Sequence, residues 1–268
     1  MGKIITVASH KGGVGKTTTV LNLGFSLSRF GQKVLLMDSD PQGAIGITSN
    51  LKKRTSKGLI NLLKKDAKPE DVIITTKDKT MGVLGIGSLE PEDVFLLEKE
   101  ARRGTLGKII RSVAKEYDYA FIDSPAGIGT IVASVLSVSD SVLMPINCRT
   151  IAVKTLPSFL KLIQRLRGKI NTNLRLEGIV ITMTDDMDSG RAVFEEITNS
   201  FPPSVIFETF IPLDESFEIA SSKAIPVGML RGGEETAQAY MNLAIEFKKR
   251  ELSDSTRGAK DEDVEGLF

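Results

Sequence analysis

The chain has 268 residues, 41% of them hydrophobic, and a formal net charge of +1 at pH 7. A sequence of this length and hydrophobic content can bury a core of its own, so disorder of the whole chain is excluded. Because the net charge is close to zero, any contact with a polyanion must come from a local basic patch.

Cysteine content and the amino-terminal stretch narrow the class of protein further. Cys148 is the one cysteine in the sequence, which excludes an internal disulfide framework and any zinc or iron–sulfur site built from the cysteines of one chain. The stretch MGKIITVAS lacks the features of a signal region, and no run of about 18 apolar residues occurs. We therefore expect a cytoplasmic protein that neither is secreted nor spans a membrane.

Short β-branched runs alternate with segments of helical periodicity along the chain. Strands are predicted over residues 3–9, 33–38, 71–76, 81–87, 119–124, 141–146, 175–183 and 205–212. Because a return crossing between parallel strands needs a helix, the alternation predicts an α/β fold: a doubly wound, mainly parallel sheet with helices on both faces.

Two helical segments and the chain end complete the predicted organisation. Residues 91–116 are predicted as helix with a break at Gly104, and residues 236–251 as a helix whose apolar positions fit a core better than a membrane surface. The sequence shows no linker or repeat over residues 1–250, which predicts one domain, residues 1–252. Few apolar residues and an acidic cluster predict a disordered acidic tail over 253–268.

The stretch SHKGGVGKTTT, residues 9–19, lies between the first predicted strand and a helix. Glycines in such a loop let backbone N–H groups converge on phosphate oxygens, and the helix amino terminus adds its dipole. Lys16 is then placed to neutralise the terminal phosphates, and the Thr17 hydroxyl to bind Mg²⁺. The standard motif has a glycine where this chain has His10, so the match is to a variant P-loop, and a structural role is favoured for His10.

Two further segments end predicted strands in acidic residues. Asp38 and Asp40 lie in VLLMDSDPQG, and Asp123 lies in YDYAFIDSPAGIG. Since ligands of open α/β sheets bind at the carboxyl ends of the strands, these carboxylates are expected beside the phosphates. There one carboxylate can hold metal-bound water and another can orient or deprotonate an attacking water, while Asp123 would serve as the Walker B acid.

With Lys11 included, KGGVGKTTT resembles the deviant Walker A signature of the ParA/MinD superfamily, and DSDPQG and FIDSPAGIG resemble its two switch segments. The likeness is nearest to the ParA/Soj branch and continues through SDSVLMPINC, LEGIVITM and IPLDESFEIASSKAIPV, so it covers most of residues 1–250. It implies a slow, partner-stimulated ATPase that uses ATP and Mg²⁺ and forms a homodimer when ATP binds.

The resemblance also implies a role for each residue of the site. Lys11 would reach across a nucleotide-sandwiched dimer to the phosphates held by the other subunit, and Asp40 would activate water. Asp38 would support the metal shell beside Thr17 and Asp123. The nucleotide-binding residues would be Lys11, Gly12, Gly13, Val14, Gly15, Lys16, Thr17 and Thr18, with Met183, Pro212 and Leu213 near the adenine.

Some positions depart from the family pattern. ParA/Soj relatives bind DNA non-specifically through a surface that is often basic where this chain has Leu213 and Asp214, and also Asp185 and Asp186. Such binding is mostly phosphate neutralisation, so these residues should weaken it. Three basic segments could compensate: residues 52–57, 164–169 and 247–251.

The favoured function is a partition or positioning ATPase. Its ATP-bound dimer would bind a matrix, expected to be nucleoid DNA, and would be released when a ParB-like or other partner stimulates hydrolysis. The cargo would be a chromosome, a plasmid or a protein assembly, and the protein would associate with the nucleoid. A ParA-like regulator that does not bind DNA is an alternative.

Other classes that share the deviant loop are weighed against this function. MinD-like positioning at a membrane is opposed by the acidic ending DEDVEGLF, which anionic lipid would repel. Cys148 alone cannot supply the cluster of a nitrogenase-reductase-like enzyme, and the chain end lacks the tyrosine cluster usual in bacterial tyrosine kinases. A module that binds ATP without hydrolysing it is disfavoured because Asp40 accompanies Lys11.

Overall fold

The computed structural model describes residues 2–48, 56–148, 151–185, 187–199 and 201–257. In this part of the chain one eight-stranded sheet has the order β3-β4-β2-β5-β1-β6-β7-β8. Neighbouring strands are parallel except for β3 and β4, which are antiparallel. The strands are β1 (Lys3–Val7), β2 (Val34–Asp38), β3 (Ile74–Thr75), β4 (Met81–Leu84), β5 (Tyr119–Asp123), β6 (Ser141–Asn147), β7 (Arg175–Thr184) and β8 (Ile211–Pro212).

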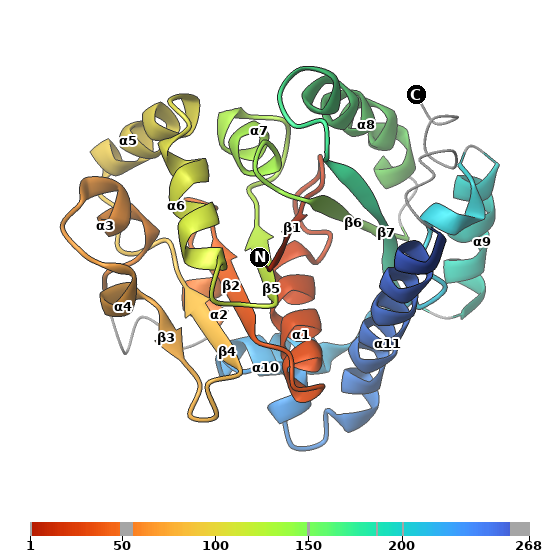
Figure 1. Ribbon diagram of the computed structural model, residues 1–268. Coiled ribbons are helices and arrows are strands. Elements are labelled where there is room, and N and C mark those ends of the chain that lie inside the picture. The colour runs from red at the N-terminus through yellow and green to blue at the C-terminus, as the bar shows by residue number, and fades with distance from the viewer. Residues whose placement is uncertain (1, 49–55, 149–150, 186, 200, 258–268) are drawn as a thin grey trace.

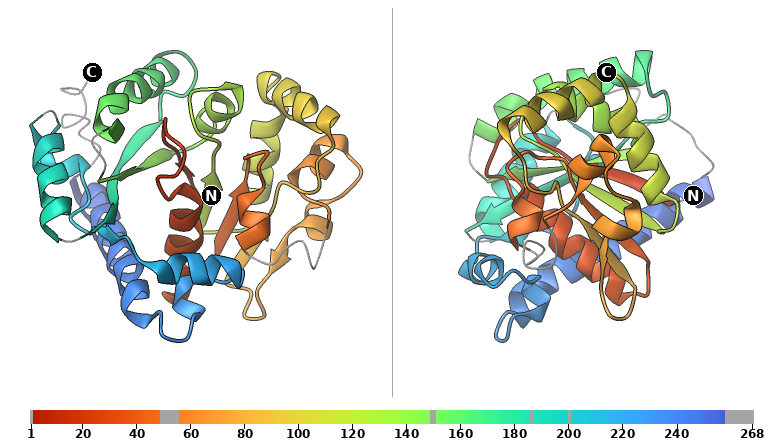
Figure 2. Two further views of the ribbon diagram at one scale, coloured as in Figure 1. Left: turned by 180° about the vertical axis from the view of Figure 1, so that it is seen from behind. Right: turned by 90° about the vertical axis from the view of Figure 1, so that its left-hand side faces the viewer.

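Helices cover both faces of the sheet, as the two-layer arrangement in Figure 1 and the reverse view in Figure 2 show. One layer contains α1 (Lys16–Arg29), α10 (Glu215–Ser222) and α11 (Glu234–Arg257). The other contains α5 (Pro91–Arg102), α6 (Thr105–Ala114), α7 (Thr130–Leu136) and α8 (Ile151–Lys169). The remaining helices are α2 (Ala44–Thr48), α3 (Leu59–Lys64), α4 (Pro69–Val72) and α9 (Met187–Thr198). The predicted doubly wound α/β class is confirmed.

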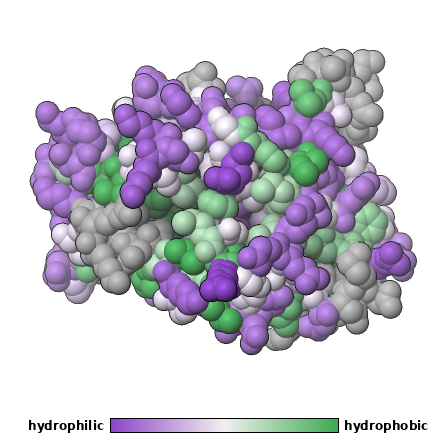
Figure 3. Space-filling model, turned by 90° about the horizontal axis from the view of Figure 1, so that it is seen from below, coloured by the Kyte–Doolittle hydropathy of each residue, from purple (hydrophilic) through white to green (hydrophobic). Residues whose placement is uncertain are grey.

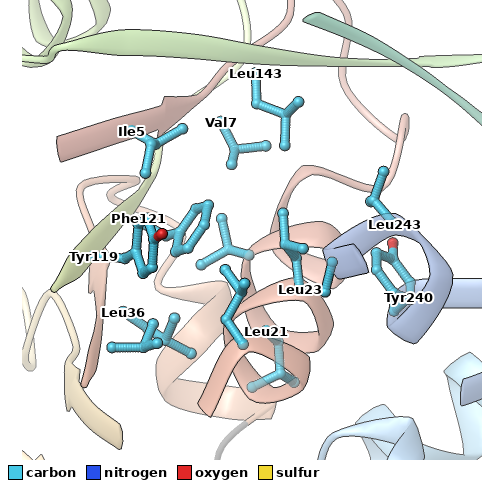
Figure 4. Packing of buried hydrophobic residues seen from close by; sticks show 14 of the residues in the cluster. Ile5, Val7, Leu21, Leu23, Leu36, Tyr119, Phe121, Leu143, Tyr240 and Leu243 are labelled. Atoms are coloured by element: carbon cyan, nitrogen blue, oxygen red, sulfur yellow. The ribbon is translucent and has the colours of Figure 1, made fainter. Parts of the chain in front are cut away.

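Side chains of the central strands alternate between two buried cores. Leu36 and Phe121 pack with α1 and α11, in the core drawn in Figure 4. Their neighbours Leu35, Met37 and Ile122 point to the opposite face and join the core formed with α3, α5 and α6. Because successive residues of a strand point to opposite faces, a strand covered on both faces must be apolar at nearly every position.

The outer surface is predominantly hydrophilic in the view from below, with hydrophobic areas scattered between the polar residues (Figure 3). Among the described helices, none is both long and apolar enough to cross a bilayer.

The predicted strand over residues 71–76 is wrong in its first half. Residues Pro69–Val72 form the single turn α4, and β3 covers only Ile74–Thr75. Pro69 stands at a helix amino terminus, where its missing N–H costs nothing, and the Asp71 carboxylate accepts the backbone N–H of Lys68. This local capping stabilises a turn in place of an extended start.

The predicted strand over residues 205–212 is also too long. Residues Pro203–Val205 form a 3₁₀ turn, and β8 covers only Ile211–Pro212. Between them the backbone N–H groups of Glu208 and Thr209 donate to the Glu246 carboxylate of α11 at 2.8 and 2.9 Å. A side chain from a distant helix thus takes the place of a neighbouring strand.

Helix boundaries follow the predictions more closely. The expected break at Gly104 is confirmed, because α5 ends at Arg102 and α6 begins at Thr105, with Gly104 in the left-handed region at φ 78°. At the chain end α11 runs on to Arg257, past the boundary predicted at Leu252. The rest of the predicted tail, residues 258–268, lies outside the described residues.

Candidate nucleotide site

The loop between β1 and α1 has the shape of a phosphate cradle. Gly13 and Gly15 have φ of 68° and 81°, a backbone conformation that favours glycine because it has no Cβ. Between them Val14 is fully buried, and its carbonyl accepts a 3.0 Å hydrogen bond from the Thr182 hydroxyl at the end of β7. The glycines shape the loop, and Val14 anchors it to the sheet.

Lys16 begins α1 and lies inside this loop. Its residue is 8% exposed, and its ammonium donates to the backbone carbonyl of Lys11 at 3.3 Å, so the side chain spans the cradle. Burial lowers the pKa of Lys16 from its usual value, while the carboxylates of Asp123 and Asp40 act against this shift. The two carboxylates favour the charged form of Lys16. A buried ammonium at the amino terminus of a helix is suited to bind a polyphosphate.

Asp123, the last residue of β5, faces the start of α1. The Thr17 hydroxyl donates to Asp123 Oδ2 at 2.5 Å, while Asp123 Oδ1 is buried and has no hydrogen-bond partner among the described atoms. Burial raises the pKa of Asp123 to about 7, although the Thr17 hydrogen bond and the Lys16 charge lower it. An orphaned buried carboxylate oxygen beside a threonine hydroxyl is a fitting place for Mg²⁺, which prefers oxygen ligands.

In the described part of the chain, no group of three or more His, Cys, Asp or Glu side chains could hold a metal by itself. A cation bound between Thr17 and Asp123 would therefore depend on phosphate oxygens and water for its other ligands. This is how Mg²⁺ is held where it binds together with a nucleotide.

Asp38 is the last residue of β2, and Asp40 lies in the turn that follows. Asp38 is buried in register with Asp123, and its two carboxylate oxygens accept the backbone N–H groups of Asp40 and Ile45, each at 3.0 Å. Burial, followed by the Asp123 charge, raises the pKa of Asp38 well above its usual value. In this structure Asp38 holds the loop between β2 and α2, and a share in the metal shell stays a prediction.

Asp40 is only partly buried and belongs to the turn that Asp38 supports. Its carboxylate accepts the Gln42 backbone N–H at 2.9 Å, and its charge acts on both Lys16 and Asp123. The structure therefore brings Lys16, Thr17, Asp40 and Asp123 to one edge of the sheet, as the sequence predicts.

The loop after β5 is tied to the phosphate cradle. The Gly127 backbone N–H donates to the Ser9 carbonyl at 3.2 Å, and the site of a Cβ on Gly12 would lie 4.0 Å from the Ala126 methyl group. Lys11, which is half-buried, lies between Ser9 and Gly12 in the same loop. Lys11 and both switch segments thus share one edge of the molecule.

A cavity of about 530 Å³ opens beside the cradle. Met183, Pro212 and Leu213, the residues predicted near the adenine, line it together with Gly15 and Thr18 of the phosphate loop. The volume lies within the range of about 300–1,000 Å³ typical of small-molecule sites. The sequence did not single out Ile47, Phe217 or Tyr240, which also line the cavity.

Met183 adopts the left-handed conformation with φ of 57°, which is uncommon for a residue other than glycine. The pairing register between β7 and β8 shifts between Thr182 and Thr184, so Met183 lies in a bulge. Backbone strain of this kind concentrates at binding sites, and here it places Met183 on the cavity wall.

The residues that depart from the family's DNA-binding pattern lie after β7 and at the cavity beside the cradle. Asp185 is exposed after β7, and Leu213 is 54% exposed at the cavity rim. Asp214 caps α10 by accepting the Ser216 backbone N–H at 2.7 Å, which holds its pKa below the usual range. Asp186 lies outside the described residues.

Known proteins are similar to this chain in sequence and in structure. The family model of an AAA domain matches residues 2–176. The sporulation initiation inhibitor protein Soj of Bacillus subtilis (strain 168) is 34% identical over 251 residues, which cover 92% of this chain and 98% of that protein.

Solved structures show the same fold. The cell division ATPase MinD of Pyrococcus furiosus is 24% identical with a TM-score of 0.76, covering 93% of this chain and 99% of that chain. Cobyrinic acid a,c-diamide synthase from Mycobacterium smegmatis, with bound ATP analogue and magnesium, is 25% identical with a TM-score of 0.74, covering 91% and 93%. The family match, the identity to Soj and the variant P-loop that starts at Lys11 together show that the chain belongs to the ParA/MinD family of P-loop ATPases.

Proposed function

We propose that this chain is a ParA-like partition or positioning ATPase that dimerises on binding ATP and Mg²⁺. The dimer binds non-specific DNA as its matrix and is released from the DNA when a ParB-like partner stimulates hydrolysis. The similarity to Soj over nearly the whole chain supports this function. Within the family, MinD-like action at a membrane is the alternative. The protein would work in the cytoplasm, on the nucleoid.

The observation that carries the proposal is Lys11, a lysine that the cradle contains in addition to Lys16. Lys16 already spans the loop from inside, so the phosphates have one buried cation from this chain. The Lys11 ammonium has no hydrogen-bond or ion-pair partner among the described residues, and it sits at the edge shared by both switch segments. A free cation there is available to phosphates that another copy of the chain brings.

The chain's own residues account for the steps of hydrolysis. The loop N–H groups and Lys16 would bind and orient the phosphates, and Thr17 and Asp123 would hold Mg²⁺, which would supply neutralising charge to the phosphoryl oxygens. Asp40 orients the attacking water and accepts its proton, since its carboxylate is near enough to influence Lys16 and Asp123. Asp38 keeps Asp40 in place by binding its backbone N–H.

ATP hydrolysis and dimerisation of the purified protein test this function. Lys16→Ala should abolish nucleotide binding, whereas Lys11→Ala should bind ATP but stay monomeric on a sizing column, since it lacks only the cation offered to the second copy. Asp40→Ala should form the dimer with Mg-ATP and remain in it. A Lys11→Ala protein that still dimerises with ATP would contradict the role of Lys11, and hydrolysis no faster than that of Lys16→Ala would contradict the ATPase.

A further inference from the structure

Two helices on the same face of the sheet contain basic residues and no acidic ones. The sequence of α6 is TLGKIIRSVA and that of α8 is IAVKTLPSFLKLIQRLRGK, while α7 between them, TIVASVL, is uncharged. The opposite face differs, because α10 and α11 begin with glutamates in their first turns. Helix α5 of the same layer, PEDVFLLEKEAR, is mixed in charge, so the excess of cations in this layer is confined to α6 and α8.

The cations form two rows. Lys161, Arg165 and Lys169 recur every four residues along α8, and we call them the α8 row; their side chains are exposed. Lys108, Arg111 and Lys115, the α6 row, recur every three or four residues along α6 and at its end, and are exposed as well. Residues at these spacings share one side of a helix.

The two rows flank α7. This helix contacts both α6 and α8, and Figure 1 shows the three helices on one side of the sheet. The apolar side of α8 packs into the core, where Leu156, Phe159 and Ile163 are buried. The exposed side that remains is polar and cationic.

Ion pairing distinguishes these cations from the basic residues of α11. In the part of the chain that the structure describes, none of the six forms an ion pair, whereas on α11 Lys248 pairs with Glu251 at 3.1 Å and Arg250 with Glu246 at 2.8 Å. Like charges four residues apart destabilise a helix by a few tenths of a kcal/mol, so an unpaired row carries a cost. The segment 247–251 is thereby largely neutralised, while the α8 row, in the segment 164–169 and just before it, is available.

The carboxylates around the rows lie on other elements: α5, which packs against α6 and α7, carries several, and its Glu100 pairs with Arg103 at 3.2 Å. Asp118, which precedes β5, accepts the Lys33 backbone N–H at 2.8 Å, and Asp140, which precedes β6, accepts the Ile4 backbone N–H at 2.7 Å. Glu116 is exposed just beyond the α6 row. Helix α8 itself contains no acidic residue beside its row of cations.

We propose that the face formed by α6, α7 and α8 binds a nucleic-acid duplex through its phosphates, with the α8 row as the main contact. The proposal rests on the proposed function and names the surface that would hold the matrix. It also moves that surface away from Asp185 and Asp214. The α8 row extends about 12 Å, at 1.5 Å per residue, so its three cations can reach separate phosphates of one duplex.

A duplex fits this face better than a lipid surface does. A helix that lies on a membrane inserts its apolar side among the acyl chains, and the apolar side of α8 is already buried under the sheet. Phosphate contacts need only exposed, flexible cations, which the α8 row provides.

The experiment measures binding to random-sequence duplex DNA over a salt series, using the full chain with Asp40→Ala and Mg-ATP as the parent. The test variant adds Lys161→Gln, Arg165→Gln and Lys169→Gln. The matched control adds Lys33→Gln, Lys77→Gln and Lys79→Gln, which removes the same charge from exposed lysines just before β2 and in the turn between β3 and β4. A sizing column verifies that all three proteins dimerise.

We expect the test variant to bind at least about tenfold more weakly at low salt, with a salt slope smaller by about three per protomer because each lost phosphate contact removes roughly 0.9. The control should keep the slope of the parent. If the parent binds DNA and the test variant binds equally well, the proposed surface is wrong and the proposed function stands. If the dimeric parent binds no DNA, or prefers vesicles of anionic lipid, both the surface and the DNA matrix are wrong.

Discussion

Asp123 is placed to bind a ligand, and its burial lowers the stability of the protein when no ligand is bound. Its carboxylate is buried beside Asp38 with one oxygen unpaired, and its pKa rises to about 7 from an ordinary value of 3.8. The folded protein therefore binds a proton more tightly than the unfolded chain does. Without a ligand, the Asp123 contribution becomes unfavourable as the pH rises from about 4 towards 7, by at most about 4 kcal/mol.

This shift predicts the behaviour of Asp123→Asn in thermal unfolding without nucleotide. At pH 8 the variant should melt at a higher temperature than the parent, because it removes a buried negative charge. Towards pH 5 the difference should shrink, since the parent is then protonated at Asp123. Asp185→Asn, which changes an exposed carboxylate, should show no such dependence, and an equal gain at both pH values would contradict the assignment.

At the residue scale, the sequence predicted the part of the site that is local in the chain. Lys16, Thr17 and Asp123 could be found because each follows a strand pattern within a few residues of a recognisable turn. Phe217 and Tyr240 could not, because they reach the cavity from helices that ordinary core periodicity describes equally well. Tyr240 is nevertheless tied to the cradle helix by a 3.1 Å hydrogen bond with Thr19.

At the element scale, α11 holds the connection between β7 and β8. The Glu246 carboxylate accepts the N–H groups of Glu208 and Thr209, and the Arg250 guanidinium lies 4.0 Å from the Phe207 ring and donates to the Ser204 carbonyl at 2.8 Å. That connection leads into β8, whose residues form a wall of the nucleotide cavity. Helix α11 therefore stabilises the connection that places β8 at the wall of the nucleotide cavity.

Glu246→Ala should lower the free energy of unfolding by about 1–3 kcal/mol, the usual cost of leaving such donors unpaired. It should also weaken nucleotide binding, because the strand that follows loses its support. Denaturant unfolding and nucleotide titration would measure the two effects. Glu235→Ala, an exposed glutamate of the same helix, is the control. A Glu246→Ala protein with unchanged stability would show that water replaces the carboxylate.

The same contact explains why the strand pattern misled at residues 205–212. The run VIFETFIP has the composition of a strand, yet its central N–H groups are satisfied by a carboxylate distant in sequence. Composition describes what a segment tolerates, whereas pairing depends on what the fold brings beside it. The buried strands β1, β2 and β5 were predictable because they are covered on both faces and leave little choice of residue.

At the scale of the whole molecule, nucleotide binding and dimerisation should be linked through stability. A ligand at 100 times its Kd stabilises the folded state by about 2.7 kcal/mol, and association adds a contribution that grows with protein concentration. With Mg-ATP, the Tm of Asp40→Ala should therefore rise as the protein is concentrated. The Tm of Lys11→Ala should rise on adding ATP but stay independent of protein concentration. Equal concentration dependence in both proteins would separate dimerisation from Lys11.

The position of β1 in the sheet has a consequence for synthesis of the chain. Its two partners are β5, where Lys3 pairs with Tyr119, and β6, where Ile5 pairs with Ser141. A ribosome adds about 5–20 residues per second, so β1 waits for several seconds or more without either neighbour. During that time the glycine loop behind it cannot take its final shape, and ATP cannot assist folding. Strand β1 is thus made well before either strand that pairs with it, and nascent-chain chaperones have that interval in which to bind it.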